Sequence, residues 1–444
     1  MPGGTCLNQG CIPKKTLLYL AGLIEDVNAL NGRGLQGSVV GDFESAVRHK
    51  ESVVGGIRKN FPVWLKRLGV RVFEGDAFVK GRRCVEVRPP EGKGRDVRHL
   101  ISDRIVIGTG GQPREISALP VDGRRILTSR DFMFHQKTLP DSVLCVGGGA
   151  IGVELGYLVR QFGARVTIVE RSPRLLDKPC IPERASAMLE RKFDRLNVEI
   201  RKGVTVVASR QRDEGVEVEL SDGTRSVYGL VLIAIGREPR TDGLGLERLG
   251  LDLDRNGFVA TNEYLETSAT GIYAIGDVKM GPMTANAALH DAKIAAGNTL
   301  GSTPAPRNYN RVPIVIDSAL EIASVGLTEE RAEHAGFEPD VARASFGGSA
   351  KARGRHDFEG VIEVVHDEET GQLLGGCIVG PEAGEQIHML TAACQSPQGL
   401  WFLKDISYSH PSWCEELENA IDPYAAAFIQ SGRDVFKPGI YAAK

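Results

Sequence analysis

Residues 142–171 read SVLCVGGGAIGVELGYLVRQFGARVTIVER, and this stretch decides the fold of the chain. An apolar run ends in glycines, a helical pattern follows, and a second apolar run ends in an acidic residue. Strand, glycine turn, helix and strand in this order form a βαβ unit, from which parallel sheets covered by helices are built. The stretch therefore predicts an α/β fold.

Gly147, Gly149 and Gly152 give this stretch a G-x-G-x-x-G pattern directly after the first strand. The first glycine permits a tight turn, the second lets the backbone approach a pyrophosphate, and the third lets the helix pack on the strand. Glu170 ends the second strand, where a carboxylate accepts a hydrogen bond from a ribose 2′-hydroxyl. Together these residues predict a dinucleotide-binding site.

The carboxylate of Glu170 also bears on which dinucleotide binds. A negative charge at this place repels the 2′-phosphate of NADP, so we expect NAD. Arg171 and Arg174 follow closely in the sequence and weaken that preference, which leaves NADP as the alternative.

The composition is that of an ordinary protein of several domains, with 444 residues of which 42% are hydrophobic. A net charge of -3 gives no global field that would attract nucleic acid or an anionic membrane surface. No apolar run approaches the ~20 residues that span a bilayer, and we expect a cytoplasmic protein. Eight cysteines are too few for a secreted disulfide scaffold, so any disulfide is expected to be catalytic.

A Gly-rich loop near the N-terminus, GGTCLNQGCIPKK (residues 3–15), contains Cys6 and Cys11. Three interpretations of these two cysteines are open: a redox pair, part of a metal site, or two buried neighbours. A zinc site needs further ligands at tight spacing and none appears, so no metal site is expected. Lys14, Lys15 and a following helix start would lower a thiolate pKa, but the spacing alone leaves the redox and buried interpretations open. The other cysteines are expected to be buried and inert: Cys84, Cys145, Cys180, Cys377, Cys394 and Cys414.

Near the C-terminus, SHPSWCEELENA places His410 five residues before Glu415. A thiol-disulfide enzyme must move a proton to and from its dithiol, and histidine suits that task at neutral pH. A carboxylate on the distal ring nitrogen would fix the tautomer. Taken alone, this pattern is more often a loop and a helix start, in which Ser412 or Glu415 serves as the cap.

In this order, the segments resemble the pyridine nucleotide-disulfide oxidoreductases, and within them the dihydrolipoamide dehydrogenase branch, from Gly3 to near residue 428. The resemblance is carried by GGTCLNQGCIPKK as the redox loop, GGGAIGVELG as the NAD fingerprint and VLIAIGREPRT as the close of the NAD domain. It is also carried by TSATGIYAIGDV as the second flavin contact, EIASVGLTEE as the start of the dimerisation domain and HPSWCEE as the His-Glu segment.

The resemblance implies two Rossmann-like nucleotide-binding domains, one for FAD and one for NAD, and a C-terminal α+β dimerisation domain. We expect residues 1–112 to form the FAD domain, 113–242 the NAD domain, 243–311 the rest of the central domain and 312–444 the dimerisation domain. Residues 431–444 extend beyond the resemblance as a tail to which no role is assigned.

The start of the chain departs from the family. Its FAD domain normally opens with a βαβ unit of about 30 or more residues ahead of the redox loop, whereas five residues precede Cys6 here. We expect a truncated sequence with an incomplete FAD half-site and an exposed sheet edge, because every later contact segment is present. The alternative is a protein that lacks this half-site.

The resemblance also assigns roles. Cys6 would be the sulfur that a dithiol attacks, and Cys11 the sulfur beside the flavin. Lys15 would lie by the flavin and pair with Glu154.

His410 and Glu415 would come from the second subunit of a homodimer. Asp277, after Gly276, would hold the ribityl chain of the flavin. Further glycines expected near the cofactors are Gly108, Gly110 and Gly236.

The implied reaction transfers electrons between a dithiol, such as dihydrolipoamide or a lipoyl carrier protein, and NAD through the disulfide and FAD. One alternative is an NAD(P)H-dependent disulfide reductase of the glutathione or mercuric reductase type; another is a non-catalytic NAD-binding dimer. Glu170 argues against NADPH, and the lack of a terminal vicinal cysteine pair argues against mercuric ion. Trp413 and Cys414 are unusual in the His-Glu segment, where they either alter the dithiol pocket or pack beneath the loop.

Overall fold

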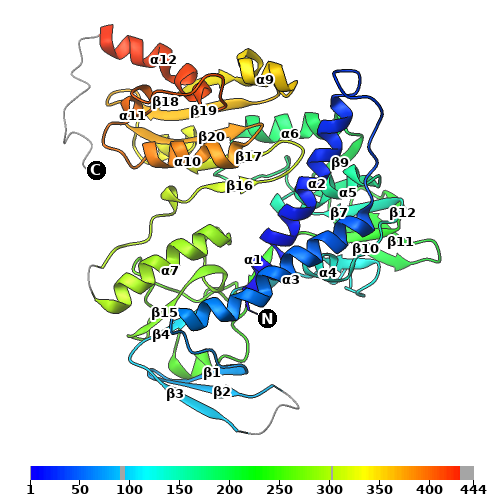
Figure 1. Cartoon of the computed structure of the whole chain (residues 1–444). Coiled ribbons are helices and arrows are strands. Elements are labelled where there is room, and N and C mark those ends of the chain that lie inside the picture. The colour runs from blue at the N-terminus through cyan, green and yellow to red at the C-terminus, as the bar shows by residue number, and fades with distance from the viewer. Residues whose placement is uncertain (1, 91–95, 302–303, 431–444) are drawn as a thin grey trace.

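The computed structural model describes residues 2–90, 96–301 and 304–430 (Figure 1). The predicted tail, residues 431–444, lies outside the described residues. In Figure 1 a C-terminal sheet with its helices lies at the top left, a parallel sheet at the right and several short strands at the bottom. The predicted α/β fold, with an additional α+β domain, is confirmed.

The segment that contains Cys6 and Cys11 is helical, so the predicted loop is wrong. The chain begins with α1 (Gly4–Gln9), α2 (Cys11–Ala29) and α3 (Phe43–Arg67). Gly10 alone separates α1 from α2. Pro13 lies in the first turn of α2, where its missing N–H costs no helical hydrogen bond.

Two pairs of strands bring distant glycine segments together. β4 (Ile105–Ile107) pairs in parallel with β15 (Ile272–Ala274), and β5 (Gly111–Pro113) pairs with β14 (Arg237–Pro239). The residues after β4 therefore lie beside those after β15. Val106 on β4 is 45% exposed, and among the described residues β15 is the only strand partner of β4, as expected for an exposed sheet edge. An antiparallel sheet lies nearby, made of β1 (Asp76–Gly81), β2 (Cys84–Arg88) and β3 (Arg98–Ile101).

The stretch 142–171 forms the predicted βαβ unit at the centre of a parallel sheet. It comprises β7 (Ser142–Val146), α5 (Ala150–Gln161) and β8 (Arg165–Glu170). The sheet order is β6-β13-β7-β8-β9, so the strand order reverses beside β7, which is where ligands bind in such sheets. The other elements are β6 (Ile126–Thr128), β9 (Val198–Lys202), β13 (Leu230–Ile233), α4 (Ser129–His135) and α6 (Glu183–Arg195). A small antiparallel sheet adjoins them: β10 (Val206–Gln211), β11 (Val216–Leu220) and β12 (Arg225–Tyr228).

A central segment leads from this sheet to the C-terminal domain. It contains α7 (Ala285–Leu300) and three short 3₁₀ helices, η1 (Leu246–Leu249), η2 (Gly276–Val278) and η3 (Tyr309–Arg311).

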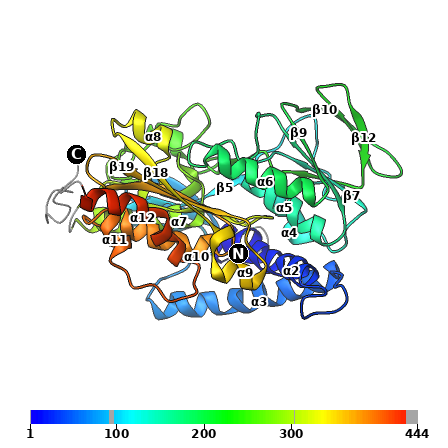
Figure 2. The ribbon, with the colours of Figure 1, turned by 90° about the horizontal axis from the view of Figure 1, so that it is seen from above.

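The C-terminal domain is an antiparallel sheet in the order β16-β17-β20-β19-β18. Its central strands are buried on both faces, because one face packs on the parallel-sheet domain and the other on helices. Figure 2 shows this domain beside the parallel-sheet domain. The strands are β16 (Ile314–Ile316), β17 (Ile322–Gly326), β18 (Pro339–Ser345), β19 (Val361–Asp367) and β20 (Leu373–Val379). The helices are α8 (Glu329–His334), η4 (Phe346–Gly348), α9 (Ala350–Arg355), α10 (Ala383–Ala393), α11 (Leu400–Lys404) and α12 (Glu415–Gln430).

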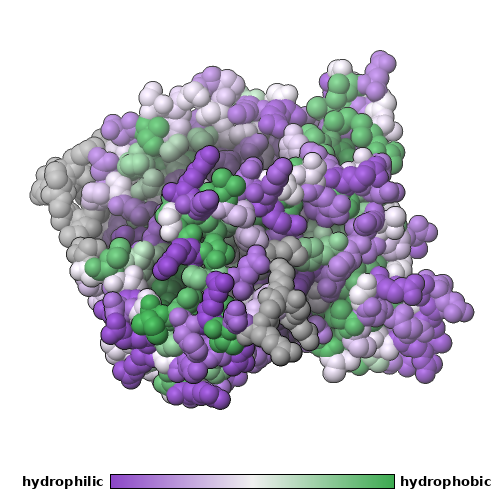
Figure 3. All heavy atoms as spheres, turned by 60° about the horizontal axis from the view of Figure 1, so that its bottom comes forward, coloured by the Kyte–Doolittle hydropathy of each residue, from purple (hydrophilic) through white to green (hydrophobic). Residues whose placement is uncertain are grey.

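The surface mixes apolar and hydrophilic residues, as Figure 3 shows for one face. Several large apolar side chains are exposed, among them Trp64, Leu289 and Leu300. Within the described part of the chain, no helix is both long and apolar enough to cross a bilayer. The predicted domain boundaries at residues 112, 242 and 311 stay predictions.

Candidate active site

Cys6 lies in α1 and Cys11 is the first residue of α2, and both are half-buried free thiols. The thiol of Cys6 donates a hydrogen bond to Cys11 and so lowers the pKa of Cys11 to about 7, with help from the charge of Lys14. The same hydrogen bond raises the pKa of Cys6. The pair is therefore asymmetric, since Cys11 holds the thiolate and Cys6 keeps the proton.

The predicted pairing of Lys15 with Glu154 is wrong, because Lys14 takes that place. Lys14 Nζ lies 2.6 Å from Glu154 Oε1, and the Glu154 side chain is 2% exposed. Neighbouring residues on an α-helix point about 100° apart, so only one of the two lysines faces α5. Burial opposes the charge of Lys14, but the carboxylate of Glu154 outweighs it and raises the pKa of Lys14. Burial also raises the pKa of Glu154, against the charge and hydrogen bond of Lys14, so each group is the main charge partner of the other beside Cys11.

Lys15 points instead to the connection between β16 and β17. Its ammonium pairs with Asp317 and lies 4.0 Å from Glu321 Oε1. The backbone N–H of Asp317 donates to Glu154 Oε1 at 3.1 Å. The start of α2 is thus tied to both the parallel-sheet domain and the C-terminal domain.

The predicted dinucleotide fingerprint lies at the N-terminus of α5. A Cβ on Gly147, whose φ is +110°, would lie 2.5 Å from the carbonyl oxygen of Ala234, and one on Gly152 would overlap the carbonyl oxygen of Gly147. Gly149, by contrast, has open space around its missing Cβ. The helix therefore packs tightly on the strand while its first turn stays open to a ligand.

Glu170 stands at the end of β8, beside the glycine turn. Its carboxylate accepts hydrogen bonds from the backbone N–H groups of Gly148, at 2.6 Å, and Ser172, at 2.8 Å. These bonds fix the carboxylate next to the N-terminus of α5, in the place that the ribose of a dinucleotide would require.

Asp277 follows β15, and Arg237 connects it to two other predicted segments. Arg237 Nε donates to Asp277 Oδ2 at 3.1 Å. Its Nη2 atom donates to the carbonyl oxygen of Gly111 at 2.6 Å and to Thr5 Oγ1 at 3.4 Å. Arg237 thus joins residues 108–111, the segment after β15 and helix α1.

The remaining predicted glycines lie around this junction. The N–H of Arg240 donates to the carbonyl oxygen of Gly110, and that of Arg114 to Gly236. Gly110 and Gly236 both have positive φ and open space around the missing Cβ, whereas a Cβ on Gly108 would touch Ile275. The backbone of this junction is therefore accessible to a ligand at two of the three positions.

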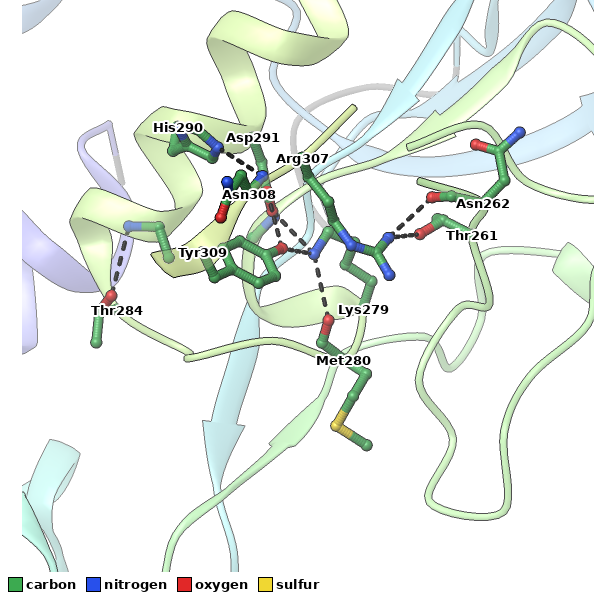
Figure 4. A network of polar contacts seen from close by, with 12 residues as sticks. Thr261, Asn262, Lys279, Met280, Thr284, His290, Asp291, Arg307, Asn308 and Tyr309 are labelled. Atoms are coloured by element: carbon green, nitrogen blue, oxygen red, sulfur yellow. Dashed lines mark hydrogen bonds and ion pairs between the residues drawn. The ribbon is translucent and has the colours of Figure 1, made fainter. Parts of the chain in front are cut away.

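A buried polar cluster behind Asp277 was missed by the sequence analysis (Figure 4). Lys279 Nζ lies 3.0 Å from Asp291 Oδ2, and both side chains are 1% exposed. Tyr309 donates to Asp291 at 2.8 Å and also contacts Lys279. Asp291 accepts the N–H of Gly276 at 3.0 Å, so the cluster anchors the turn that carries Asp277. Two features of the sequence could have revealed this cluster: a lysine directly after residues 276–278, and an aspartate within the mostly apolar helix α7.

His410 and Glu415 contact each other, as their spacing predicted. His410 Nδ1 lies 2.9 Å from Glu415 Oε2, and the histidine side chain is 74% exposed. Glu415 also accepts the N–H of Ser412, while Ser412 Oγ accepts the N–H of Glu415. One carboxylate therefore both caps α12 and holds the imidazole, so the two interpretations of this segment are compatible.

Trp413 and Cys414 pack beneath this segment. Trp413 is 5% exposed and meets Phe346 edge to face, while the cations of Lys351 and Arg355 lie over its ring. Cys414 is half-buried, and burial raises its pKa. Within the described chain this favours a packing role for both residues.

The chain matches a known family over most of its length. Residues 2–292 match the model described as pyridine nucleotide-disulphide oxidoreductase, and residues 312–421 match the dimerisation domain of the same family. The chain belongs to this family. It is 36% identical over 423 residues to a dihydrolipoyl dehydrogenase of Chlorobaculum tepidum, which covers 94% of this chain and 89% of that protein.

Solved structures of similar fold include LpdA from Mycobacterium tuberculosis, with a TM-score of 0.88 and 24% identity, covering 95% of this chain and 91% of that one. The HOCl-induced flavoprotein disulfide reductase RclA from Escherichia coli has a TM-score of 0.82 and 26% identity, with the same coverage.

Membership in the pyridine nucleotide-disulphide oxidoreductases confirms the predicted enzyme class and its cofactors, FAD and NAD. The dimerisation domain supports the expected homodimer. The residues present fit NAD and the part of FAD that the segment after β15 would contact. The open first turn of α5 beside Glu170 suits a dinucleotide, and the junction at Arg237 brings Asp277 next to the redox helix.

Proposed function

We propose that this pyridine nucleotide-disulphide oxidoreductase transfers electrons between a dithiol and NAD through a Cys6–Cys11 disulfide and FAD. The dithiol is dihydrolipoamide, free or attached to a lipoyl carrier protein, as the dihydrolipoyl dehydrogenases similar to this chain suggest. The observation that carries the proposal is the pair of half-buried cysteines where α1 meets α2, beside the ion pair of Lys14 and Glu154.

The two sulfurs have different roles in this proposal. A substrate thiolate attacks the sulfur of Cys6, and the bond between Cys6 and Cys11 breaks. The second substrate thiol then displaces Cys6, so the substrate leaves as a disulfide while Cys6 holds a proton and Cys11 a negative charge. Lys14, held by Glu154, stabilises that charge. When bound, FAD would supply the two-electron chemistry that links Cys11 to NAD.

His410 and Glu415 serve the site of the partner subunit in this proposal. α12, which begins at Glu415, packs on β18 and β19, whereas α1 packs on α2, α3 and α4. The imidazole is largely exposed and its Nδ1 is held by Glu415, which leaves Nε2 for the substrate proton. A homodimer would bring such an exposed histidine to the thiols of the other chain.

NAD is favoured by the carboxylate of Glu170 and by the contacts that Arg174 already makes. Arg174 pairs with Asp177 at 3.1 Å and donates to the carbonyl oxygens of Leu176 and Ile181, so its charge is already engaged. This supports NAD over NADP. We also keep the cytoplasmic location and the domain boundaries as proposals.

A second candidate is a disulfide reductase that runs electrons from NADH to a disulfide, favoured by the likeness to RclA. Both directions use the same residues. Purified full-length protein with bound FAD distinguishes them: we expect dihydrolipoamide to reduce NAD with a kcat/KM about tenfold or more above that for NADP. Turnover only with NADH and a disulfide would support the reductase. A protein that binds NAD but turns over neither substrate would contradict both.

A further inference from the structure

A closed network of buried polar groups lies behind the turn of residues 276–278 (Figure 4). Lys279 directly follows the turn, Asp291 lies on α7 and Tyr309 on η3. Lys279 Nζ lies 3.0 Å from Asp291 Oδ2, and both side chains are 1% exposed. Nζ also donates to the carbonyl oxygen of Met280 at 3.2 Å and contacts the hydroxyl of Tyr309. These three acceptors match the three N–H groups of a charged lysine, so its hydrogen bonding is complete.

Asp291 is the member of this network that touches the turn. Its Oδ1 accepts the hydroxyl of Tyr309 at 2.8 Å, while its Oδ2 accepts the backbone N–H of Gly276 at 3.0 Å. A Cβ on Gly276, whose φ is +68°, would lie 3.2 Å from Cβ of Ala288, so the turn packs closely on α7. The bond to Asp291 therefore fixes the backbone directly before Asp277.

The side chain of Asp277 is held by a separate contact. Arg237 Nε donates to Asp277 Oδ2 at 3.1 Å, and the two side chains are 13% and 16% exposed. Arg237 thus fixes the carboxylate, while Asp291 fixes the peptide unit before it. Movement of the turn is opposed at two points.

Stability alone does not account for a buried pair of Lys279 and Asp291. The cost of removing two charges from water is about as large as their attraction, and apolar residues of similar size often serve a fold equally well. Apolar residues could not accept the N–H of Gly276, which would then be left without a partner at a cost in free energy. The network therefore provides one correctly oriented acceptor for the turn.

We propose that Lys279, Asp291 and Tyr309 are positioning residues of the flavin site, which hold the turn of residues 276–278 in the conformation that binds FAD. Asp291 acts on the turn directly, and the other two residues keep its carboxylate in one orientation. None of the three needs to touch the cofactor. The inference rests on the expected role of Asp277 in holding the ribityl chain of FAD, and not on the proposed dithiol reaction.

The test compares two double variants that both remove the charges of the pair. Lys279→Met/Asp291→Asn keeps an oxygen that can accept the N–H of Gly276, whereas Lys279→Met/Asp291→Leu does not. FAD release from the full-length, FAD-containing protein after dilution is followed by the rise in flavin fluorescence. We expect release about tenfold faster in Lys279→Met/Asp291→Leu, the effect of one lost hydrogen bond, and within about threefold of the unchanged protein in Lys279→Met/Asp291→Asn. Rescue by asparagine separates the bond to the turn from a general effect of charge.

Arg307→Met is the matched control. Arg307 Nη1 donates to Thr261 Oγ1 at 2.9 Å and to the carbonyl oxygen of Asn262 at 2.8 Å, as Figure 4 shows. Within the described part of the chain it makes no hydrogen bond to residues 276–278. Its rate of FAD release should therefore equal that of the unchanged protein.

Tyr309→Phe is the second variant, in case Lys279→Met/Asp291→Leu does not fold. It removes the hydroxyl that donates to Asp291 and leaves the N–H of Gly276 with its acceptor. Because the carboxylate is then less well oriented, we expect FAD release to be about threefold faster. Release at the unchanged rate would contradict the inference.

Equal rates of FAD release from the two double variants would overturn the inference, because the acceptor for Gly276 would then not matter. The same acceleration in Arg307→Met would also overturn it, since any change in this region would then release the flavin. Asp277→Ala tests the role on which the inference rests: if its release is unchanged, that role and the inference fall together. If Asp277→Ala releases FAD faster and the double variants do not, only the inference falls. No turnover is measured, so failure of the proposed dithiol reaction is a separate result.

Discussion

Lys14 Nζ lies 2.6 Å from Glu154 Oε1, and this ion pair joins the helix of Cys11 to the helix of the dinucleotide fingerprint. Its neighbour Lys15, whose side chain is 54% exposed, pairs with Asp317 in another domain. The adjacent residues Lys14 and Lys15 thus hold helix α2 against two different parts of the fold.

Replacing Lys14 should cost far more stability than replacing Lys15. Lys14→Met leaves the carboxylate of Glu154 buried without its cation, for which we expect a loss of about 3–5 kcal/mol in the free energy of unfolding. Lys15→Met removes a pair whose lysine is more than half exposed, and should cost about 1 kcal/mol or less. Denaturant unfolding of both variants measures the difference. A larger loss of stability in Lys15→Met than in Lys14→Met would favour the pairing of Lys15 with Glu154 that the sequence predicted.

Gly149 and Gly152 should respond differently to alanine. The φ of Gly149 is −76°, and its Cβ position is open, so Gly149→Ala should keep the melting temperature but weaken NAD binding at least about tenfold by filling the space of the pyrophosphate. Gly152→Ala should lower the melting temperature, because the new Cβ meets the carbonyl oxygen of Gly147. Thermal unfolding and NAD titration separate the two effects. Unchanged NAD affinity in Gly149→Ala would show that the pyrophosphate does not bind at this turn.

Glu415→Gln should reduce dithiol turnover by roughly 10²–10⁴, the range for loss of an oriented general base. The amide no longer supports a positive charge on His410, although it can still accept the N–H of Ser412. Stability should change little. Ser412→Ala is the control, because it removes a cap bond of α12 without touching the imidazole. If turnover falls in Ser412→Ala but not in Glu415→Gln, the role of Glu415 is to cap α12 and not to support His410.

Cys6→Ser should abolish dithiol turnover and keep reduction of the flavin by NADH, because the substrate loses the sulfur that it attacks while both cofactor sites remain. Stopped-flow spectra with each reductant measure the two half-reactions. Dithiol turnover at more than a few per cent of the unchanged rate would assign the attacked sulfur to another residue.

Local spacing was enough to predict the features that depend on backbone sterics. The glycines at 147, 149 and 152 and the acidic end of β8 predicted the βαβ unit and its ligand edge, because only glycine fits at 147 and 152 and the open space at 149 lets a ligand approach. The contact between His410 and Glu415 was also predictable, since they lie only five positions apart in the sequence.

The sequence could not predict contacts that depend on how helices face one another. Whether Lys14 or Lys15 meets Glu154 depends on the rotation of α2 about its axis, which the packing of Leu17, Ala21 and Ile24 determines. The same holds for Asp317, which becomes part of the site only when the C-terminal domain packs on the first two helices.

The partners of α1 and α2 lie far along the chain: Thr5 contacts Arg237 across 232 residues, and Lys15 contacts Asp317 across 302. The positions of the two sulfurs therefore depend on how distant parts of the chain pack together, although the groups that lower the pKa of Cys11, namely Cys6 and Lys14, are its neighbours in the sequence.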